Sequence, residues 1–502
     1  MSVRGTRAEH LTHPRTVALG ALWNVLGRIG PLIVAVGATP FLIRELGVAR
    51  WGVFTLALSL IGMFGIFDFG VGRALTRLIA DRLATGEEAQ AASSVRTGIV
   101  VLTALGAVGA VVMALGAHLY TTLALHLPPA LEREVLAALY VLCASAPLVV
   151  LNAALWGVLS AFQRFASANL VNLPILAMYY LGPLLVLPFF NSLVAVMLVL
   201  VACRVVMTYF YWRICVQSMP SLRQARFAWG SVLPVLQFGG WLTVSNFVWP
   251  LMLYMDRFVI AAVLSAAATA YYATPFDLIV RFSVVPVAIM QTAFPAITTA
   301  YRQSPQHAAR LFRFSSLAIA VGLLAPTLVV IGFAEPLLRL WLGASFAAQA
   351  SGVLRLLGAG VLFMCADTVP AGLLDGIGRP DLNAKLAVAS LLLYVPALFA
   401  LIHGFGIAGA ALAWAGRVIA TYAARLLIAW HSYRPLSAEM LRLLPPLVVA
   451  LFAVLTMLAA RALAPQAVVL AGCLAVFGAV VWLVALTAEE RAYVQARIRR
   501  RR

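Results

Sequence analysis

Charge is scarce in this 502-residue chain. Only 11% of its residues are Asp, Glu, Lys or Arg, whereas 63% are hydrophobic, and the mean hydropathy is +0.99. An average soluble domain carries about 25% charged residues and about 45–50% apolar ones. The composition therefore excludes a soluble globular protein, and no polar stretch is long enough for a separate soluble domain. The chain is predicted to be a polytopic membrane protein.

Several kinds of chemical site are missing as well. The five cysteines form no Cys-x-x-Cys pair, and no histidine stands at metal-ligand spacing from cysteines or carboxylates. We therefore expect neither a metal nor a cofactor. No glycine-rich loop with a lysine is present to hold phosphates, which argues against an ATP-driven pump. The outer connectors are short, so a non-enzymatic function is predicted.

Long apolar runs dominate what remains. A bilayer core about 30 Å thick needs about 20 residues of helix, and the sequence supplies roughly fourteen such runs. The alternating ten-residue strands of a membrane barrel are missing, so an all-α bundle is predicted. The expected spans are 17–43, 51–79, 97–119, 135–160, 169–190, 193–216, 232–264, 270–298, 311–333, 350–374, 383–402, 406–430, 443–463 and 467–487.

The chain is predicted to contain two six-helix lobes, 1–216 and 217–430, followed by two extra helices and a basic tail, 431–502. A polar connector at 217–230 separates the lobes, and the second half resembles the first. The run 46–54 between helices one and two has a loose counterpart in 264–272, between helices seven and eight. Each run precedes a helix that carries Asp and then Arg. Transporters commonly arise from duplicated halves.

The net charge of +19 has an ordinary explanation in a membrane protein. Basic residues crowd the connectors on the side shared by both tails, for example Arg82, Arg96, Arg223 and the final run 499–502. The positive-inside rule therefore predicts that both termini are cytoplasmic, as an even number of helices requires. The same rule accounts for most of the charge, so no nucleic-acid partner is expected. The terminal arginines favour contact with anionic lipid headgroups or with solvent.

Arginines inside the apolar runs are the best indication of function. A cation at the bilayer centre costs ~2.5–3.5 kcal/mol on insertion scales, so such residues usually face a partner or a water-filled cavity. Several together predict a cationic chamber and an anionic passenger. The residues of this kind are Arg28, Arg73, Arg257, Arg281 and, on helix twelve, Arg417.

The acids inside the spans leave a second interpretation open, in which the arginines form structural salt bridges between helices. Four acids lie there: Asp68, Asp256, Asp277 and Asp367. Asp277 and Arg281 are four residues apart, which permits a pair within one helix. Arg417 and Arg425 share a face of helix twelve that carries no acid. Arg204, on helix six, is a possible partner for Asp367 or a further lining residue.

Three stretches resemble the polysaccharide flippases of the multidrug/oligosaccharidyl-lipid/polysaccharide exporter superfamily. They are Gly47 to Gly72 with its Trp51-Gly52-Val53-Phe54 and Asp68-Phe69-Gly70-Val71-Gly72 patterns, then 255–260, and then Gly376-Ile377-Gly378-Arg379-Pro380. The resemblance covers most of the chain. It implies a bacterial inner-membrane transporter of undecaprenyl-diphosphate-linked oligosaccharide, from the cytoplasmic to the periplasmic leaflet, for polysaccharide or lipopolysaccharide biosynthesis.

The resemblance also implies a mechanism. In the related lipid II flippases, arginines on helices one, two and eight face a central cationic cavity, and Arg28, Arg73 and Arg281 lie on those helices here. Alternating access would carry the glycan through, with Asp68, Asp256 or Asp277 as coupling acids. A polysaccharide polymerase and chain-length machinery are the implied partners. The choice among O-antigen, capsule and exopolysaccharide stays open, as does the driving force.

Two other functions are compatible with parts of this sequence. A cation-coupled multidrug exporter of the same superfamily would need a cavity rich in acids and poor in arginine. A membrane glycosyltransferase or polymerase acting on the same lipid carrier would need catalytic acids on an exposed loop. The four membrane acids are instead spread over four helices.

Overall fold

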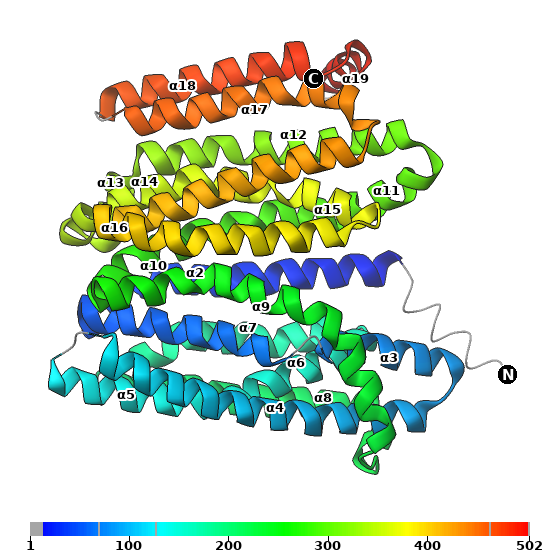
Figure 1. Ribbon diagram of the computed structural model, residues 1–502, viewed down its shortest axis with the longest axis vertical. Coiled ribbons are helices and arrows are strands. Elements are labelled where there is room, and N and C mark those ends of the chain that lie inside the picture. Colours follow the sequence, from blue (N-terminus) through cyan, green and yellow to red (C-terminus); the bar gives the residue numbers. More distant parts are fainter. Residues whose placement is uncertain (1–13, 69–70, 126–127, 461–462, 500–502) are drawn as a thin grey trace. The chain divides into compact units, whose positions relative to one another are not determined.

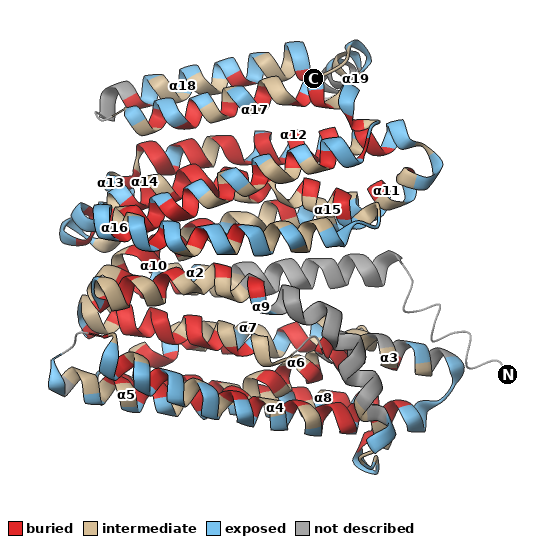
Figure 2. Cartoon of the chain, in the orientation of Figure 1, coloured by how far each residue is buried: buried red, intermediate tan, exposed pale blue. Residues whose placement is uncertain are grey.

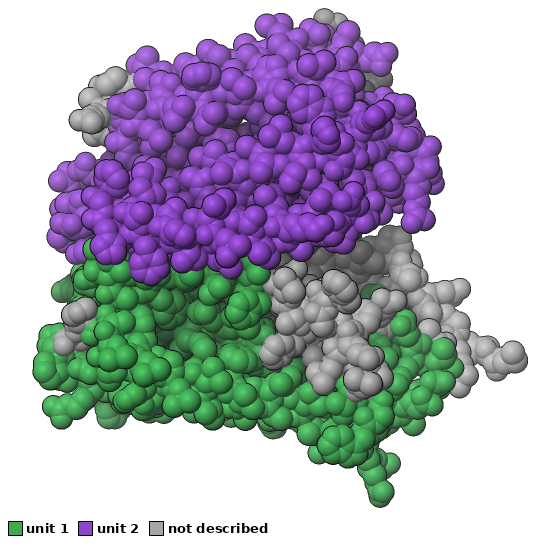
Figure 3. Space-filling model, in the orientation of Figure 1, with its two compact units in different colours: residues 1–270 green, residues 271–502 purple. Residues whose placement is uncertain are grey.

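The computed structural model describes residues 14–68, 71–125, 128–460 and 463–499, and within these ranges every regular element is a helix. The chain divides into two compact units, Met1–Ala270 and Tyr271–Arg502 (Figures 1 and 3). The all-α prediction is confirmed. The boundary at 270 leaves α9 in unit 1, whereas the sequence grouped this helix with the second lobe; the predicted lobes stay a prediction.

Among its described residues, unit 1 holds one very long helix, α2, seven others and the first residues of α10. Their bounds are α2 Pro14–Met63, α3 Val71–Thr85, α4 Glu88–Leu123, α5 Pro129–Cys143, α6 Ala146–Ala161, α7 Phe165–Val186, α8 Leu193–Ser218 and α9 Val232–Val263, with short 3₁₀ turns at Phe64–Asp68, Pro220–Arg223 and Trp229–Ser231.

Unit 2 begins within α10. Its helices are α10 Ala266–Val280, α11 Val284–Gln303, α12 Pro305–Gly332, α13 Ala334–Leu342, α14 Ala344–Ala366, α15 Thr368–Gly376, α16 Pro380–Ser432, α17 Leu436–Ala459, α18 Leu463–Val480 and α19 Ala488–Arg499, with a 3₁₀ turn at Arg281–Ser283 and a π turn at Val481–Ala485.

Two glycines bend the longest helices. Gly47 interrupts α2 at φ 75° and ψ 160°, and Gly406 interrupts α16 at φ 59° and ψ −139°. Both conformations are strained for any residue with a Cβ. Each helix is therefore two membrane spans joined by a tight turn, which agrees with the predicted breaks after residues 43 and 402.

The number of spans agrees with the prediction. Among the described residues, 11 stretches are long and apolar enough to cross a membrane. Two of them contain the bends at Gly47 and Gly406, and α9 provides a further apolar helix of 32 residues. Dividing the bent helices and adding α9 gives fourteen. The helices often extend beyond the predicted spans, as in α4, because polar residues continue them outside the hydrocarbon region.

The apolar side chains divide between a core and an outer face. In unit 1, α2 packs on α7, α4 packs on α6, and α5 packs on α8. Trp51, Phe54 and Leu42 lie in this core, each at most 3% exposed. Large side chains on the other face of α4, such as Leu115 at 62%, remain exposed. Exposed and buried stretches alternate along α4 in Figure 2. Such a face is expected where a helix meets lipid rather than water.

Charged residues hold the ends of several helices. Arg50 pairs with Glu134 at 2.9 Å and donates to Asn191. The other oxygen of Glu134 accepts the Leu193 backbone N–H at the start of α8. An acid at a helix N-terminus satisfies a free backbone donor and complements the helix dipole. This network joins three connecting regions of unit 1.

In unit 2, the fully buried Arg313 of α12 pairs with two glutamates. The Nε–Oε2 distance to Glu439 of α17 is 2.6 Å, and the Nη2–Oε1 distance to Glu490 of α19 is 2.5 Å. Arg313 also donates to the Ala485 carbonyl. Glu490 forms a capping box with Thr487 at the start of α19. Arg313 therefore anchors the last helices of the chain to α12.

Candidate substrate site

The predicted site residues fall on both units. Arg28 lies in α2 and Arg73 in α3. Their side chains are outside the part of the structure that is described, so their facing stays a prediction.

Asp68 lies where the second predicted span breaks. The 3₁₀ turn that follows α2 ends at this residue, and α3 begins at Val71. The Asp68 carboxylate accepts the Gly72 backbone N–H at 2.9 Å. It therefore satisfies a free donor at the N-terminus of α3, where negative charge is favoured. This contact gives Asp68 a structural role in addition to the predicted one.

The eighth predicted span, 270–298, breaks in a comparable way. α10 ends at Val280, and residues Arg281 to Ser283 form a 3₁₀ turn before α11. The Arg281 side chain is exposed, and Asp277 is half-buried one turn earlier. The pair between these two that the spacing permits is not among the salt bridges of the described residues. Within the part of the chain that the structure describes, the exposed Arg281 guanidinium has no salt bridge.

Asp256 and Arg257 are buried on α9, at 1% and 2% exposure. Arg257 donates from Nη1 to the Ser59 hydroxyl at 2.9 Å, and its guanidinium lies 5.7 Å from the centre of the Tyr254 ring. The Asp256 carboxylate accepts the Arg257 backbone N–H at 3.2 Å. Arg257 therefore links α9 to the second part of α2 within unit 1. Whether it also faces a passenger stays a prediction.

Three polar contacts follow one face of α16 in unit 2. The Arg417 guanidinium lies 4.8 Å from the centre of the Tyr394 ring, and Thr421 shares a hydrogen bond of 3.0 Å with Ser390. Arg425 forms a salt bridge with Asp367. Residues four apart lie above one another on a helix, so the contacts form a ladder. Neither Ser390 nor Tyr394 was singled out in the sequence.

Asp367 has a partner other than the suggested Arg204. Asp367 lies between α14 and α15 in unit 2 and pairs with Arg425, so another element supplies an acid to this face of α16. Arg204 lies in unit 1, with its guanidinium 5.2 Å from the centre of the Tyr179 ring and its Nη1 3.9 Å from the Met207 sulfur. A cation over an aromatic face needs no carboxylate. Pairs between distant helices could not be read from one sequence.

The connector motif at 376–380 also has a local explanation. Gly378 adopts φ 82° between α15 and α16, and Arg379 donates to Asp381 at 3.0 Å. The hydrogen bond from Arg379 lowers the pKa of Asp381 to about 2. The motif therefore shapes an exposed turn. Within the described residues, no group of three or more His, Cys, Asp or Glu side chains could hold a metal ion.

Comparison with known proteins gives these features a family. A profile described as "Polysaccharide biosynthesis protein" matches residues 17–301, more than half of the chain. The chain belongs to this family. It is also similar to a putative O-antigen transporter of Shigella flexneri, at 25% identity over 421 residues, which cover 80% of this chain and 95% of the relative.

Solved structures of low sequence identity share the fold. An inward-facing multidrug resistance MATE transporter of the MOP superfamily aligns with a TM-score of 0.67 and 14% identity, over 82% of this chain and 99% of that one. The lipid II flippase MurJ, in an inward closed conformation, aligns at 0.66 and 13%, over 93% and 99%. This chain therefore has the fold of the superfamily named from the sequence, and it is a multi-pass membrane protein of a transporter family, not an enzyme.

Proposed function

We propose that this chain is a flippase that moves undecaprenyl-diphosphate-linked oligosaccharide from the cytoplasmic to the periplasmic leaflet of a bacterial inner membrane. The family match and the similarity to a putative O-antigen transporter support a polysaccharide passenger. The likeness to a lipid II flippase supports a fold able to carry a glycan on a lipid. Both termini would be cytoplasmic, in agreement with the distribution of arginine.

The exposed guanidinium of Arg281 carries the proposal. It stands at the break between α10 and α11, inside an apolar stretch, without a salt bridge among the described residues. A diphosphate must lose its water to cross the membrane, and guanidinium groups replace that water through charge-assisted, often bidentate hydrogen bonds. Together with Arg28 and Arg73, Arg281 would form the cationic chamber, with Arg417 as a further lining residue.

Alternating access would then move the polar head through the chamber while the polyprenyl tail remains in lipid. Asp68, Asp256 or Asp277 would bind a coupling cation or proton. Asp367 has a different assignment, since its salt bridge with Arg425 makes it a counter-ion within unit 2. A polysaccharide polymerase and its chain-length machinery would receive the delivered substrate.

The test compares Arg281→Ala with Arg310→Ala, an exposed arginine near the start of α12. Each variant replaces the native chain, and the leaflet location of the lipid-linked oligosaccharide is measured. We expect Arg281→Ala to leave the completed glycan on the cytoplasmic leaflet, whereas Arg310→Ala exports normally. Arg281→Lys should rescue in part if charge is the main requirement, and poorly if the planar fork matters.

Arg28→Ala and Arg73→Ala should behave like Arg281→Ala, at unchanged abundance in the membrane. Normal export by all three alanine variants would refute the cationic chamber. An incomplete glycan in cells without the protein would instead indicate a glycosyltransferase or polymerase. Efflux of an organic cation that depends on an acid and not on Arg281 would indicate a multidrug exporter.

A further inference from the structure

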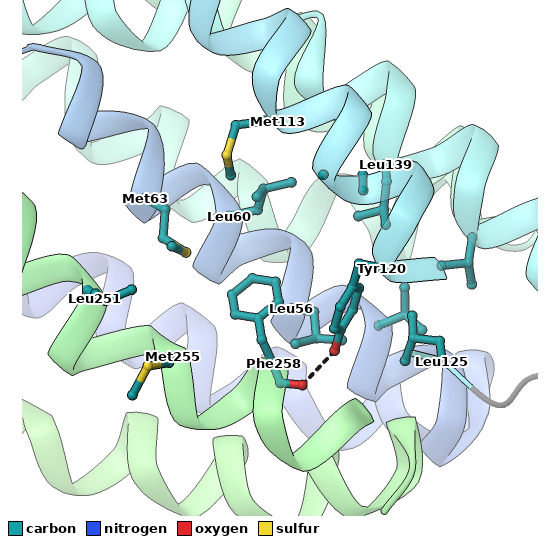
Figure 4. Close-up of a pocket in the computed structure, with 14 residues that line it drawn as sticks. Leu56, Leu60, Met63, Met113, Tyr120, Leu125, Leu139, Leu251, Met255 and Phe258 are labelled. Atoms are coloured by element: carbon teal, nitrogen blue, oxygen red, sulfur yellow. Dashed lines mark hydrogen bonds between the residues drawn. The ribbon is translucent and has the colours of Figure 1, made fainter. Parts of the chain in front are cut away.

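A partly open apolar cavity lies inside unit 1. Its volume is about 290 Å³, and its walls come from the second part of α2, from α4, α5 and α9 (Figure 4). Its lining is apolar apart from the hydroxyl of Tyr120, and it includes Leu56, Leu60, Met113, Gly116 and Leu251. None is charged.

The one polar side chain in the wall already has a partner. Tyr120 donates its hydroxyl to the Phe258 carbonyl at 2.7 Å, and the two rings meet edge to face (Figure 4). A buried water needs two to four polar partners, which this cavity does not offer. A diphosphate or a glycan would lose its solvation without compensation. The occupant must therefore be apolar.

The surroundings indicate which apolar molecule is available. On α4, the lining residues Met113 and Gly116 alternate in sequence with Val112, Leu115 and Leu119, whose side chains are 51%, 62% and 56% exposed. Such a face of a membrane-spanning helix borders hydrocarbon. Acyl chains are the main component of that hydrocarbon, whereas a lipid-linked sugar is rare.

The volume and the packing agree with one chain end. At about 290 Å³ the cavity has roughly twice the volume of an apolar cavity that binds benzene, about 150 Å³, so it admits a chain end of several carbons. Around Gly116 an added Cβ would meet nothing within 4 Å, so the wall is open at this point. Side chains that line a void lose their dispersion contacts, and an acyl chain would restore them.

We propose that this cavity binds the acyl chain of a bilayer phospholipid. The bound chain contacts α2, α4, α5 and α9 at once, and it favours the arrangement in which α9 packs on α2 and α4. The site is independent of the passenger and of the proposed transport function.

The test is photolabelling of the purified full-length protein in vesicles that contain phosphatidylethanolamine with a diazirine near the end of one acyl chain. Labelled positions are mapped by mass spectrometry. Leu56 and Leu60 are only 3% and 5% exposed, so surface lipid does not reach them, and label there reports the cavity. Label on the exposed Leu115 is the internal standard for contact with bulk lipid.

We expect label on Leu56 and Leu60 in the native protein, and its fall to background in Gly116→Leu, whose side chain fills the cavity. Gly116→Ala adds one methyl group and should keep the label. Gly472→Leu makes the same change at another exposed helical glycine with open space around it, and should also keep it. If Gly116→Leu does not fold, Leu251→Trp fills the cavity from α9.

Three results would overturn the proposal. One is native protein without label on Leu56 and Leu60. Another is label that persists in folded Gly116→Leu and Leu251→Trp. The third is label from a diazirine-bearing polyprenyl phosphate but not from the phospholipid, which would assign the cavity to the lipid carrier.

Discussion

Removing both glutamates around Arg313 should destabilise the protein far more than removing either one. The Arg313 side chain is 0% exposed, and its two counter-ions are 13% and 19% exposed. With one glutamate neutralised, the cation keeps the other as its partner; the loss is the ion pair with Glu439 or the hydrogen bond with Glu490, and the hydrogen bond to a charged group is worth about 1.5–3 kcal/mol. In Glu490→Gln the capping box with Thr487 survives, because glutamine also serves as the N3 residue of a capping box.

With both neutralised, the buried cation has no counter-ion. Breaking a buried ion pair by removing a partner costs about 3–5 kcal/mol, and the double variant leaves Arg313 with amides alone. Adding Arg313→Leu to the double variant removes the uncompensated charge. That triple variant should therefore recover most of the lost stability, since an apolar residue in place of a buried ion pair is often neutral or stabilising.

Thermal unfolding with a thiol-reactive dye suits this series, because Cys143, Cys203, Cys215 and Cys365 are buried in the folded protein. We expect the midpoint of Glu439→Gln/Glu490→Gln to fall by more than the sum of the single shifts, and to rise again with Arg313→Leu. Additive single shifts, or a triple variant less stable than the double, would refute the description of Arg313 as a buried cation that depends on these two acids.

Two further predictions concern unit 2. Arg425→Gln should destabilise the protein by about 3–5 kcal/mol, because it leaves the Asp367 carboxylate without its counter-ion. Asp367→Asn in the same background should restore part of this stability. A double variant no more stable than Arg425→Gln would contradict the ion pair. Arg355→Met should lower the free energy of unfolding by about 1.5–3 kcal/mol, because Arg355 donates to the carbonyls of Met457, Leu458 and Ala460 at the end of α17. Hydrogen exchange should rise first at that end of α17. A uniform rise along the helix would contradict this role of Arg355.

The sequence was sufficient for what depends on local composition. Twenty consecutive apolar residues have few alternatives to a membrane helix, so the spans and the two tight turns near Gly47 and Gly406 could be predicted. Ion pairs could not, because their partners are far apart in sequence: Arg425 and Asp367 are separated by 58 positions, and Arg313 and Glu490 by 177. Arg313 lies close to a predicted span end, where an arginine ordinarily reaches water.

The charged residues of the second and eighth predicted spans, 51–79 and 270–298, illustrate how one pattern serves two purposes; these spans are called helices two and eight below. Both helices carry Asp and then Arg, and both are interrupted by a 3₁₀ turn, at Phe64–Asp68 and at Arg281–Ser283. In helix two the acid lies at the break and caps the half-helix that follows. In helix eight the arginine lies at the break, directly after the C-terminal end of α10, where a cation is favoured by the helix dipole. Each break thus lowers the cost of a charge within the membrane, and in helix eight it does so without using the guanidinium donors. No carboxylate of the described residues forms a salt bridge with Arg281, so under the proposed function its donors would be available to an anionic passenger.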